Sequence, residues 1–205
     1  MDFGWFAGLT GFAFAMAATP GPNNTMVAAS GATYGVARTL PLMSGIGIGV
    51  GAIMLTVAAF GSSFVADPRV GAVLKWIGVA YLLWLAWKIA KAKPELETQS
   101  TEGSAKRAPL SFVQGALFQF VNPKLWVMVS GAVVTYGQTA GEDGRTTLAL
   151  LFACVFGLTT FISTFAWSAL GASVGRVLAS RRAVRAFNIV MAALLVASLL
   201  PIILE

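Results

Sequence analysis

The chain has 205 residues, of which 57% are hydrophobic and only 11% are charged. A soluble globular domain carries about 25% charged residues, because water has to solvate its surface. The composition therefore excludes an ordinary soluble enzyme and a disordered protein, and it predicts an integral membrane protein. There is no histidine and a single cysteine, Cys154. We therefore expect no histidine-based catalysis, no metal site, no cofactor and no disulfide within one chain.

Six apolar stretches follow one another along the chain. A membrane-spanning helix needs about 20 apolar residues, and an open sheet cannot satisfy its backbone hydrogen bonds in lipid. We therefore predict an all-α membrane protein with six transmembrane helices. The predicted helices occupy residues 3–33, 40–63, 70–91, 109–136, 146–172 and 183–204.

The basic residues are distributed unequally between the predicted loops. Only Arg69 and Arg145, with Lys75 as a third at most, fall on the side of the second and fourth loops. The other side carries ten, and the positive-inside rule places these in the cytoplasm. Both termini are then expected in the periplasm of a bacterial inner membrane, and the net charge of +6 reflects topology rather than a nucleic-acid partner. The ten are Arg38, Lys88, Lys91, Lys93, Lys106, Arg107, Arg176, Arg181, Arg182 and Arg185.

A polar segment, residues 92–108, divides the chain into halves of three predicted helices each. Three is an odd number, so the second half, about 109–205, enters the membrane in the opposite orientation to the first, about 1–91. Both halves begin with a long apolar stretch that proline interrupts. Inverted repeats with broken helices are typical of secondary transporters. We expect residues 1–205 to form one such domain.

The first interruption is expected to break the helix and expose polar groups. Pro20 and Pro22 lack backbone N–H groups, and Gly21 permits unusual dihedrals. Freed backbone groups in lipid must face protein or a watery cavity. Asn23 and Asn24 can hydrogen-bond those groups or a ligand, and a helix that restarts near Asn23 offers its N-terminal amides to a carboxylate. The alternative is a kink used only for packing.

The second interruption is Asn122-Pro123-Lys124, in the fourth predicted helix. Pro123 is expected to break this helix. Lys124 would place a charge inside an apolar run, and such groups are costly and usually functional. It could pair with a substrate carboxylate or with the carbonyls freed at the first break. The alternative is that the span begins later and that Lys124 reaches the membrane surface.

All acidic side chains lie in predicted loops or at the termini. A cationic substrate or a carboxylate proton relay would be difficult to bind without acids in the membrane. The predicted substrate is therefore neutral or zwitterionic. The eight acidic residues are Asp2, Asp67, Glu95, Glu97, Glu102, Glu142, Asp143 and Glu205.

Small residues line parts of the second and fifth predicted helices. Gly45 and Gly49, like Gly47 and Gly51, have the small-xxx-small spacing that allows close helix packing. The alternative for these glycines is a face that lines the substrate path or forms a homodimer. Thr160 begins a polar stripe of the fifth helix, which serves either packing or cavity lining.

Three motifs lie in order over nearly the whole chain: Thr19 to Asn24, Lys75 to Lys88 and Phe118 to Lys124. Together they resemble the LysE/RhtB family of bacterial amino-acid exporters. Through Phe187-Asn188-Ile189-Val190, the sixth predicted helix resembles that of the cysteine/O-acetylserine exporter-like branch. One departure concerns Gly49: many family members carry an acidic residue directly after this glycine, whereas this chain has Val50.

These observations together predict a secondary exporter of small neutral or zwitterionic amino acids or related metabolites. The resemblance implies proton coupling. The two broken helices would form one midplane substrate site used in alternating access. A non-transporting membrane sensor or interaction subunit is the alternative, whereas an electron shuttle would need a second cysteine and a metal exporter would need histidines or membrane acids. The predicted substrate-binding residues are Pro20, Gly21, Pro22, Asn23, Asn24, Asn122, Pro123 and Lys124.

Overall fold

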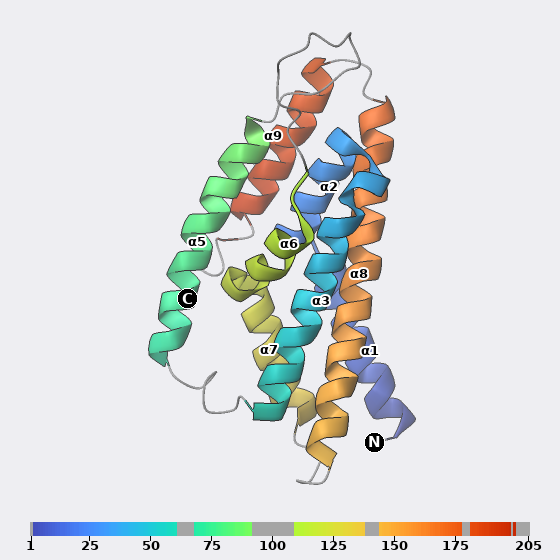
Figure 1. The fold of residues 1–205 in the computed structure, drawn as a ribbon, viewed down its shortest axis with the longest axis vertical. Coiled ribbons are helices and arrows are strands. Elements are labelled where there is room, and N and C mark those ends of the chain that lie inside the picture. Colours follow the sequence, from blue (N-terminus) through green and yellow to red (C-terminus); the bar gives the residue numbers. More distant parts are fainter. Residues whose placement is uncertain are drawn as a thin grey trace.

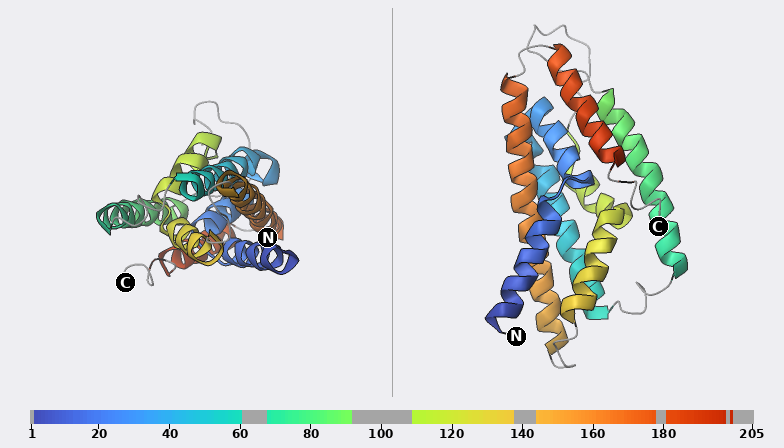
Figure 2. Two further views of the ribbon diagram at one scale, coloured as in Figure 1. Left: turned by 90° about the horizontal axis from the view of Figure 1, so that it is seen from below. Right: turned by 180° about the vertical axis from the view of Figure 1, so that it is seen from behind.

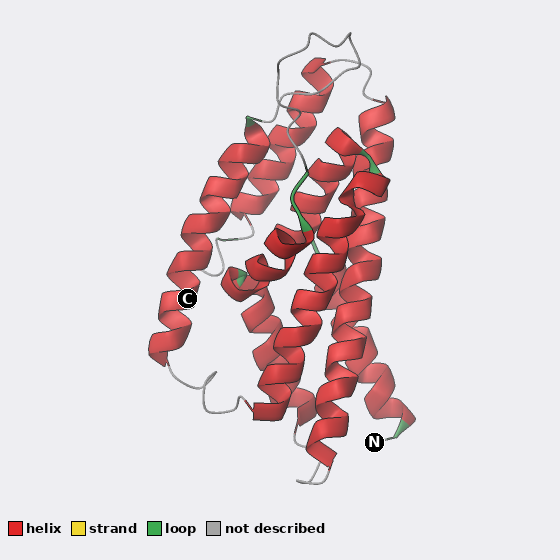
Figure 3. Cartoon of the chain, viewed as in Figure 1, coloured by secondary structure: helices red, strands yellow, loops and turns green. Residues whose placement is uncertain are grey.

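A computed structural model describes residues 2–60, 68–91, 109–137, 144–177, 181–197 and 199. Within these residues the regular secondary structure is entirely helical, which confirms the all-α prediction (Figure 3). The predicted linker, 92–108, lies outside the described residues. The elements are α1 (Phe3–Ala18), α2 (Pro22–Tyr34), α3 (Val36–Phe60), α5 (Pro68–Ala90), α6 (Phe112–Phe118), the 3-10 helix η1 (Gln119–Val121), α7 (Pro123–Tyr136), α8 (Arg145–Val177) and α9 (Arg181–Ala197).

Within the described residues, two helices are long and apolar enough to cross a membrane by themselves. These are α3 and the part of α8 from Arg145 to Gly175. The pair formed by Phe112–Val121 and Pro123–Tyr136 is bent by 66° and would be a third span if it crosses as one broken helix. α1 and residues 185–197 of α9 are shorter apolar helices. The six-span inverted repeat therefore stays a prediction.

The long helices α3 and α8 run along the long axis of the molecule, whereas the short α6 is inclined to it (Figure 1). One end holds the α2–α3 junction, the end of α5, the end of α8 and the start of α9. It carries Arg38, Lys88, Arg182 and Arg185, whereas Arg145 begins α8 at the opposite end. Both views of Figure 2 place α5 at the edge of the bundle, where it packs chiefly against α9.

Glycines bring α3 close to two neighbours. Gly45 and Gly49 face α6, where an added Cβ at Gly45 would collide with a backbone carbonyl. Gly47 and Gly51 face α8, where an added Cβ at Gly51 would lie 3.0 Å from the Ala153 carbonyl oxygen. The packing interpretation of these glycines is confirmed. Because both faces are occupied within the chain, a homodimer would have to form through another surface.

Buried apolar side chains form two clusters, and buried polar side chains lie between them. On α3, Ile46 belongs to the first cluster and Val50, one turn later, to the second. Along the path from α6 to α7, Phe118 belongs to the first cluster and Leu125 to the second. Between α1 and α2, Ala13 belongs to the second cluster and Met26 to the first, and along α8 Phe156 belongs to the second cluster while Phe161 packs against the first. The polar side chains between the clusters are Asn24, Thr25, Gln119, Asn122, Thr159, Thr160, Ser163 and Thr164.

We predict that Gly171→Ala destabilises the fold. An added Cβ at Gly171, on α8, would collide with the Ala28 carbonyl of α2. Overpacking of this kind costs about 1–3 kcal/mol, and each kcal/mol lowers the melting temperature of a chain this long by about 2–4 °C. The measurement is thermal unfolding of the detergent-purified protein.

The matched control is Gly11→Ala, because an added Cβ at Gly11 meets nothing within 4 Å. Alanine favours a helix over glycine, so this variant should melt at or above the native temperature. Equal melting temperatures for the two variants would contradict the packing account.

Candidate functional site

The first helix breaks where its two prolines predict. α1 ends at Ala18, and α2 begins at Pro22, a position where the missing proline N–H costs no helical hydrogen bond. Gly21 precedes it with φ 177°, which is extended backbone that any residue can adopt. The backbone conformation therefore does not call for glycine at this position. The absence of a Cβ matters instead because a neighbouring side chain, that of Lys124, lies close to Gly21.

The carbonyls that the break frees are hydrogen-bonded by side chains. A helix end leaves its last carbonyls without intrahelical partners, and these cannot remain bare in lipid. Asn24 donates to two of them, the Ala17 oxygen at 2.7 Å and the Thr19 oxygen at 2.9 Å. From α8, Ser163 Oγ donates to the Ala17 oxygen at 2.8 Å, and Trp167 Nε1 donates to the next carbonyl at 3.2 Å. Asn24 is thus the cap of the broken helix.

The second break lies between α6 and α7. α6 begins with a capping box in which Ser111 and Gln114 satisfy each other's backbone N–H groups. The chain then tightens into η1, and the Asn122 N–H donates to the Gln119 carbonyl at 3.3 Å. Pro123 starts α7 in a new direction. The second proline motif therefore also produces the predicted break.

Lys124 connects the two breaks. Its ammonium donates to the Thr19 carbonyl at 2.8 Å and to Thr19 Oγ1 at 2.7 Å. Of the alternatives for this charge, the structure shows the one in which it pairs with freed backbone at the other break. The lysine side chain crosses Gly21 so closely that an added Cβ there would lie 2.8 Å from Lys124 Cδ. Glycine is needed at this position because the lysine passes over it.

Gln119 is a site residue that the sequence analysis missed. It is fully buried and forms a reciprocal amide pair with Asn23, with both hydrogen bonds at 3.0 Å. Its Oε1 also accepts from Asn122 Nδ2 at 3.3 Å. Gln119 therefore joins the asparagines of the two breaks. The sequence does contain one indication of its role: Gln119 is the single polar residue in the apolar run 117–121, and this run directly precedes Asn122.

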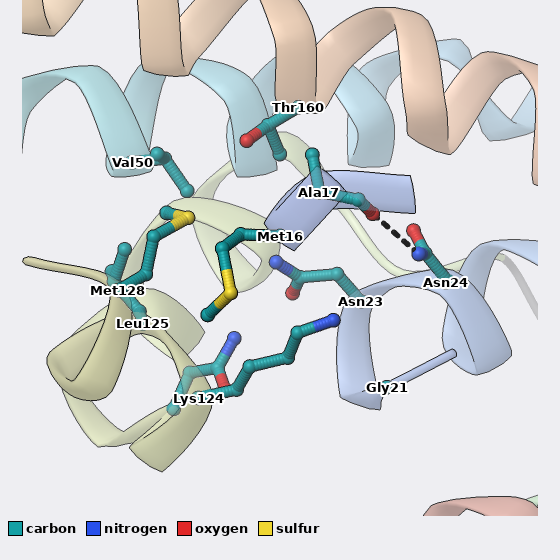
Figure 4. A pocket seen from close by; sticks show the side chains of 11 residues that line it. Met16, Ala17, Gly21, Asn23, Asn24, Val50, Lys124, Leu125, Met128 and Thr160 are labelled. Carbon is teal, nitrogen blue, oxygen red and sulfur yellow. Dashed lines mark hydrogen bonds between the residues drawn. The ribbon is translucent and has the colours of Figure 1, made fainter. Parts of the chain in front are cut away.

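A small cavity lies where the two breaks meet (Figure 4). Figure 4 shows Asn23 and Lys124 extending toward this space, while Leu125 and Met128 of α7 lie on its other side. Its volume of about 30 Å³ holds about two water molecules and not an amino acid. Thr160 of α8 also lines the cavity, which supports cavity lining, rather than packing alone, as the role of this threonine in the polar stripe of α8. The lining residues are Met16, Ala17, Gly21, Asn23, Asn24, Val50, Asn122, Lys124, Leu125, Met128 and Thr160.

The predicted site residues divide into two groups. Gly21, Asn23, Asn24, Asn122 and Lys124 all line the cavity. The three prolines do not line it, and they act by placing the helix ends around it. Among the lining residues in the described part of the chain, Lys124 is the only charged one. Val50 lines the cavity at the position where many members of the resembled family carry an acid.

The chain is similar to known translocators. The family model described as LysE type translocator matches residues 14–200. The cysteine/O-acetylserine efflux protein of Escherichia coli K12 is 33% identical over 187 residues, which cover 88% of each chain. That of Salmonella typhimurium is 32% identical over 183 residues, again 88% of each. That of Klebsiella pneumoniae is 42% identical over 125 residues, 60% of this chain and 57% of that protein. No solved structure matches the chain.

We predict that Gly21→Ala releases Lys124 from Thr19 without unfolding the protein. The new Cβ would meet only the flexible end of the lysine, with Cδ at 2.8 Å and Nζ at 3.0 Å. Losing a charge-assisted hydrogen bond is worth about 1.5 kcal/mol or more, which corresponds to about tenfold. Acylation of the Lys124 amine by a membrane-permeant reagent should therefore be about tenfold faster, as followed by mass spectrometry. The control is again Gly11→Ala. Equal acylation rates in both variants would contradict the account in which Gly21 leaves room for Lys124 to reach Thr19.

Proposed function

The chain belongs to the LysE type translocator family, and from that premise we propose that it exports small neutral or zwitterionic amino acids or related metabolites by secondary active transport. It is a transporter rather than an enzyme, and a multi-pass protein of the bacterial inner membrane. The observation that carries the proposal is the hydrogen bond from Lys124 to Thr19, which joins the two helix breaks beside a cavity.

The groups around the cavity match the two charges of an amino acid. A carboxylate needs an ammonium or amide donor, and an ammonium needs carbonyl or amide oxygens. Lys124 supplies the ammonium, and the Thr19 carbonyl at the first break gains a free acceptor position when Lys124 leaves it. Because Lys124 is the only charged residue among the described residues of the wall, a substrate with a cationic side chain would face repulsion there without a compensating acid. The names of the relatives suggest cysteine and O-acetylserine as substrates to test.

The small size of the cavity supports an alternating-access mechanism, which is part of the proposal. The space is too small for an amino acid, so binding requires the two breaks to separate. The bonds of Lys124 to Thr19 would then open, and the ammonium would turn to the substrate carboxylate. We propose that the breaks lie near the membrane midplane of two inverted repeats, with both termini in the periplasm. Proton coupling is proposed as well, with Lys124 as the ionisable group at the cavity.

Uptake into inside-out vesicles tests the proposal. Labelled cysteine, O-acetylserine and lysine are offered to vesicles that contain the protein, with and without a proton gradient. We expect saturable uptake of the two neutral compounds, stimulated by the gradient, and little uptake of lysine. Strong uptake of lysine would contradict the substrate class. Absence of uptake for every amino acid would favour a non-transporting sensor or interaction subunit.

We predict that Asn23→Ala, Asn122→Ala and Lys124→Ala each reduce uptake in this assay at least about tenfold. Removing one hydrogen-bonding partner from a desolvated charged site costs about 2–5 kcal/mol. Thr160→Ala should reduce uptake far less. Each variant should elute as a folded protein from size-exclusion chromatography in detergent. Near-native uptake by folded Lys124→Ala would contradict the role of the lysine.

A further inference from the structure

One buried polar side-chain atom of the cavity-lining residues, Asn122 Oδ1, has no hydrogen-bond partner among the described residues. Asn122 is 2% exposed, and its Oδ1 accepts no hydrogen bond from the described residues. Leaving a buried acceptor unsatisfied costs about 1–3 kcal/mol. The neighbouring amides differ, because Asn23 pairs with Gln119, and Asn24 caps α1. An acceptor that is buried and vacant at a cavity wall is suited to a ligand that brings its own donor.

The orientation of this asparagine depends on a backbone carbonyl one helical turn before Gln119. Gln119 Nε2 donates to the Gly115 oxygen at 3.0 Å. A carbonyl can only accept, so the amide nitrogen of Gln119 has to face Gly115. The same nitrogen donates to Asn23 Oδ1 at 3.0 Å. The glutamine therefore cannot exchange its oxygen and nitrogen positions without losing the hydrogen bonds that this nitrogen donates to Gly115 and Asn23.

The fixed glutamine oxygen in turn orients both asparagines. Gln119 Oε1 accepts from Asn23 Nδ2 at 3.0 Å and from Asn122 Nδ2 at 3.3 Å. Asn122 must present its nitrogen to Gln119, which leaves its oxygen on the other side of the amide. A flipped Asn122 would place two acceptor oxygens against each other. The vacancy at Asn122 Oδ1 is therefore imposed by the network that begins at Gly115.

We propose that Gln119 is a positioning residue that holds Asn122 Oδ1 as the acceptor for the amino group of the substrate. This inference rests on the proposed export function and makes it more specific. The substrate ammonium donates to Asn122 Oδ1 while its carboxylate pairs with Lys124, two residues further along the chain. The site then recognises the two groups that all free α-amino acids share. The substrate side chain is left to the apolar wall of Met16, Val50 and Met128.

Two competitors that differ only in the amino group test this assignment. S-methylcysteine and 3-(methylthio)propionate are titrated against binding of labelled cysteine to the purified protein. In the native chain the compound with the amino group should bind at least about tenfold more tightly, as expected for a charge-assisted hydrogen bond. In Asn122→Leu this preference should fall toward unity, because the acceptor is gone.

Gln119→Met tests the positioning role. Methionine keeps the length of the glutamine side chain but has no amide, so Asn122 would be free to turn, and the preference for the amino group should fall about tenfold. Gln114→Met, in the preceding helix α6 and outside the cavity wall, is the control and should keep the native preference. A residue that only supports the fold would weaken both competitors equally and leave their ratio unchanged.

The outcomes separate the two levels of the proposal. An unchanged preference in folded Asn122→Leu and Gln119→Met, with cysteine still bound, overturns the roles given to Asn122 and Gln119 while export stands. If the native protein binds neither cysteine nor S-methylcysteine, the proposed substrate class is wrong, and the assignment fails with it. A change of ratio in only Asn122→Leu would keep the acceptor and remove Gln119 as its positioning residue.

Discussion

A backbone carbonyl cannot stay unpaired inside an apolar helix bundle, and the break between α1 and α2 frees several of them. The side chains that satisfy these carbonyls define much of the site. Asn24 comes from the restarted helix, Ser163 and Trp167 come from α8, and Lys124 comes from the second break. The carbonyl groups at the end of α1 are therefore hydrogen-bonded by residues from three other helices, α2, α7 and α8. This requirement places the two proline motifs side by side.

In the proposed transport cycle the same constraint links binding to movement. Lys124 bonds to Thr19 in the structure, and we propose that a substrate carboxylate competes for the same ammonium. Exchange of one partner for the other would then loosen the contact between the breaks when the substrate binds. A cavity that holds about two water molecules has to expand for this to happen. In this account the energy of substrate binding is coupled to separation of the helix ends because both use one lysine.

The sequence predicted the positions of the breaks but not their geometry. Pro22 and Pro123 each begin a helix, as their missing N–H groups require. Their presence carries no information on the bend of 66° between α6 and α7, which depends on how α6 packs against the glycines of α3. Lys124 was expected to bind substrate, to pair with freed carbonyls or to reach the membrane surface, and its pairing with the Thr19 carbonyl is seen only in the tertiary contacts.

Gln119 shows why part of the site could not be predicted. Its partner Asn23 is 96 residues away, and no local pattern of apolar residues signals a pair of that separation. Asn24, by contrast, belongs to the predicted motif, but its side chain is used to cap the end of α1. A motif therefore indicated which segments meet, whereas the division of labour between its two asparagines required the three-dimensional contacts.

The central claim, that the two breaks form one substrate site, is tested most directly by substrate protection of two cavity positions. Met16 lies before the first break and Met128 after the second, and both line the cavity. Single variants Met16→Cys and Met128→Cys are made in a Cys154→Ala chain and alkylated with a maleimide at increasing concentrations of O-acetylserine. We expect both cysteines to be protected with the same half-maximal concentration. Protection of only one of them, or of the two at clearly different concentrations, would contradict a single shared site.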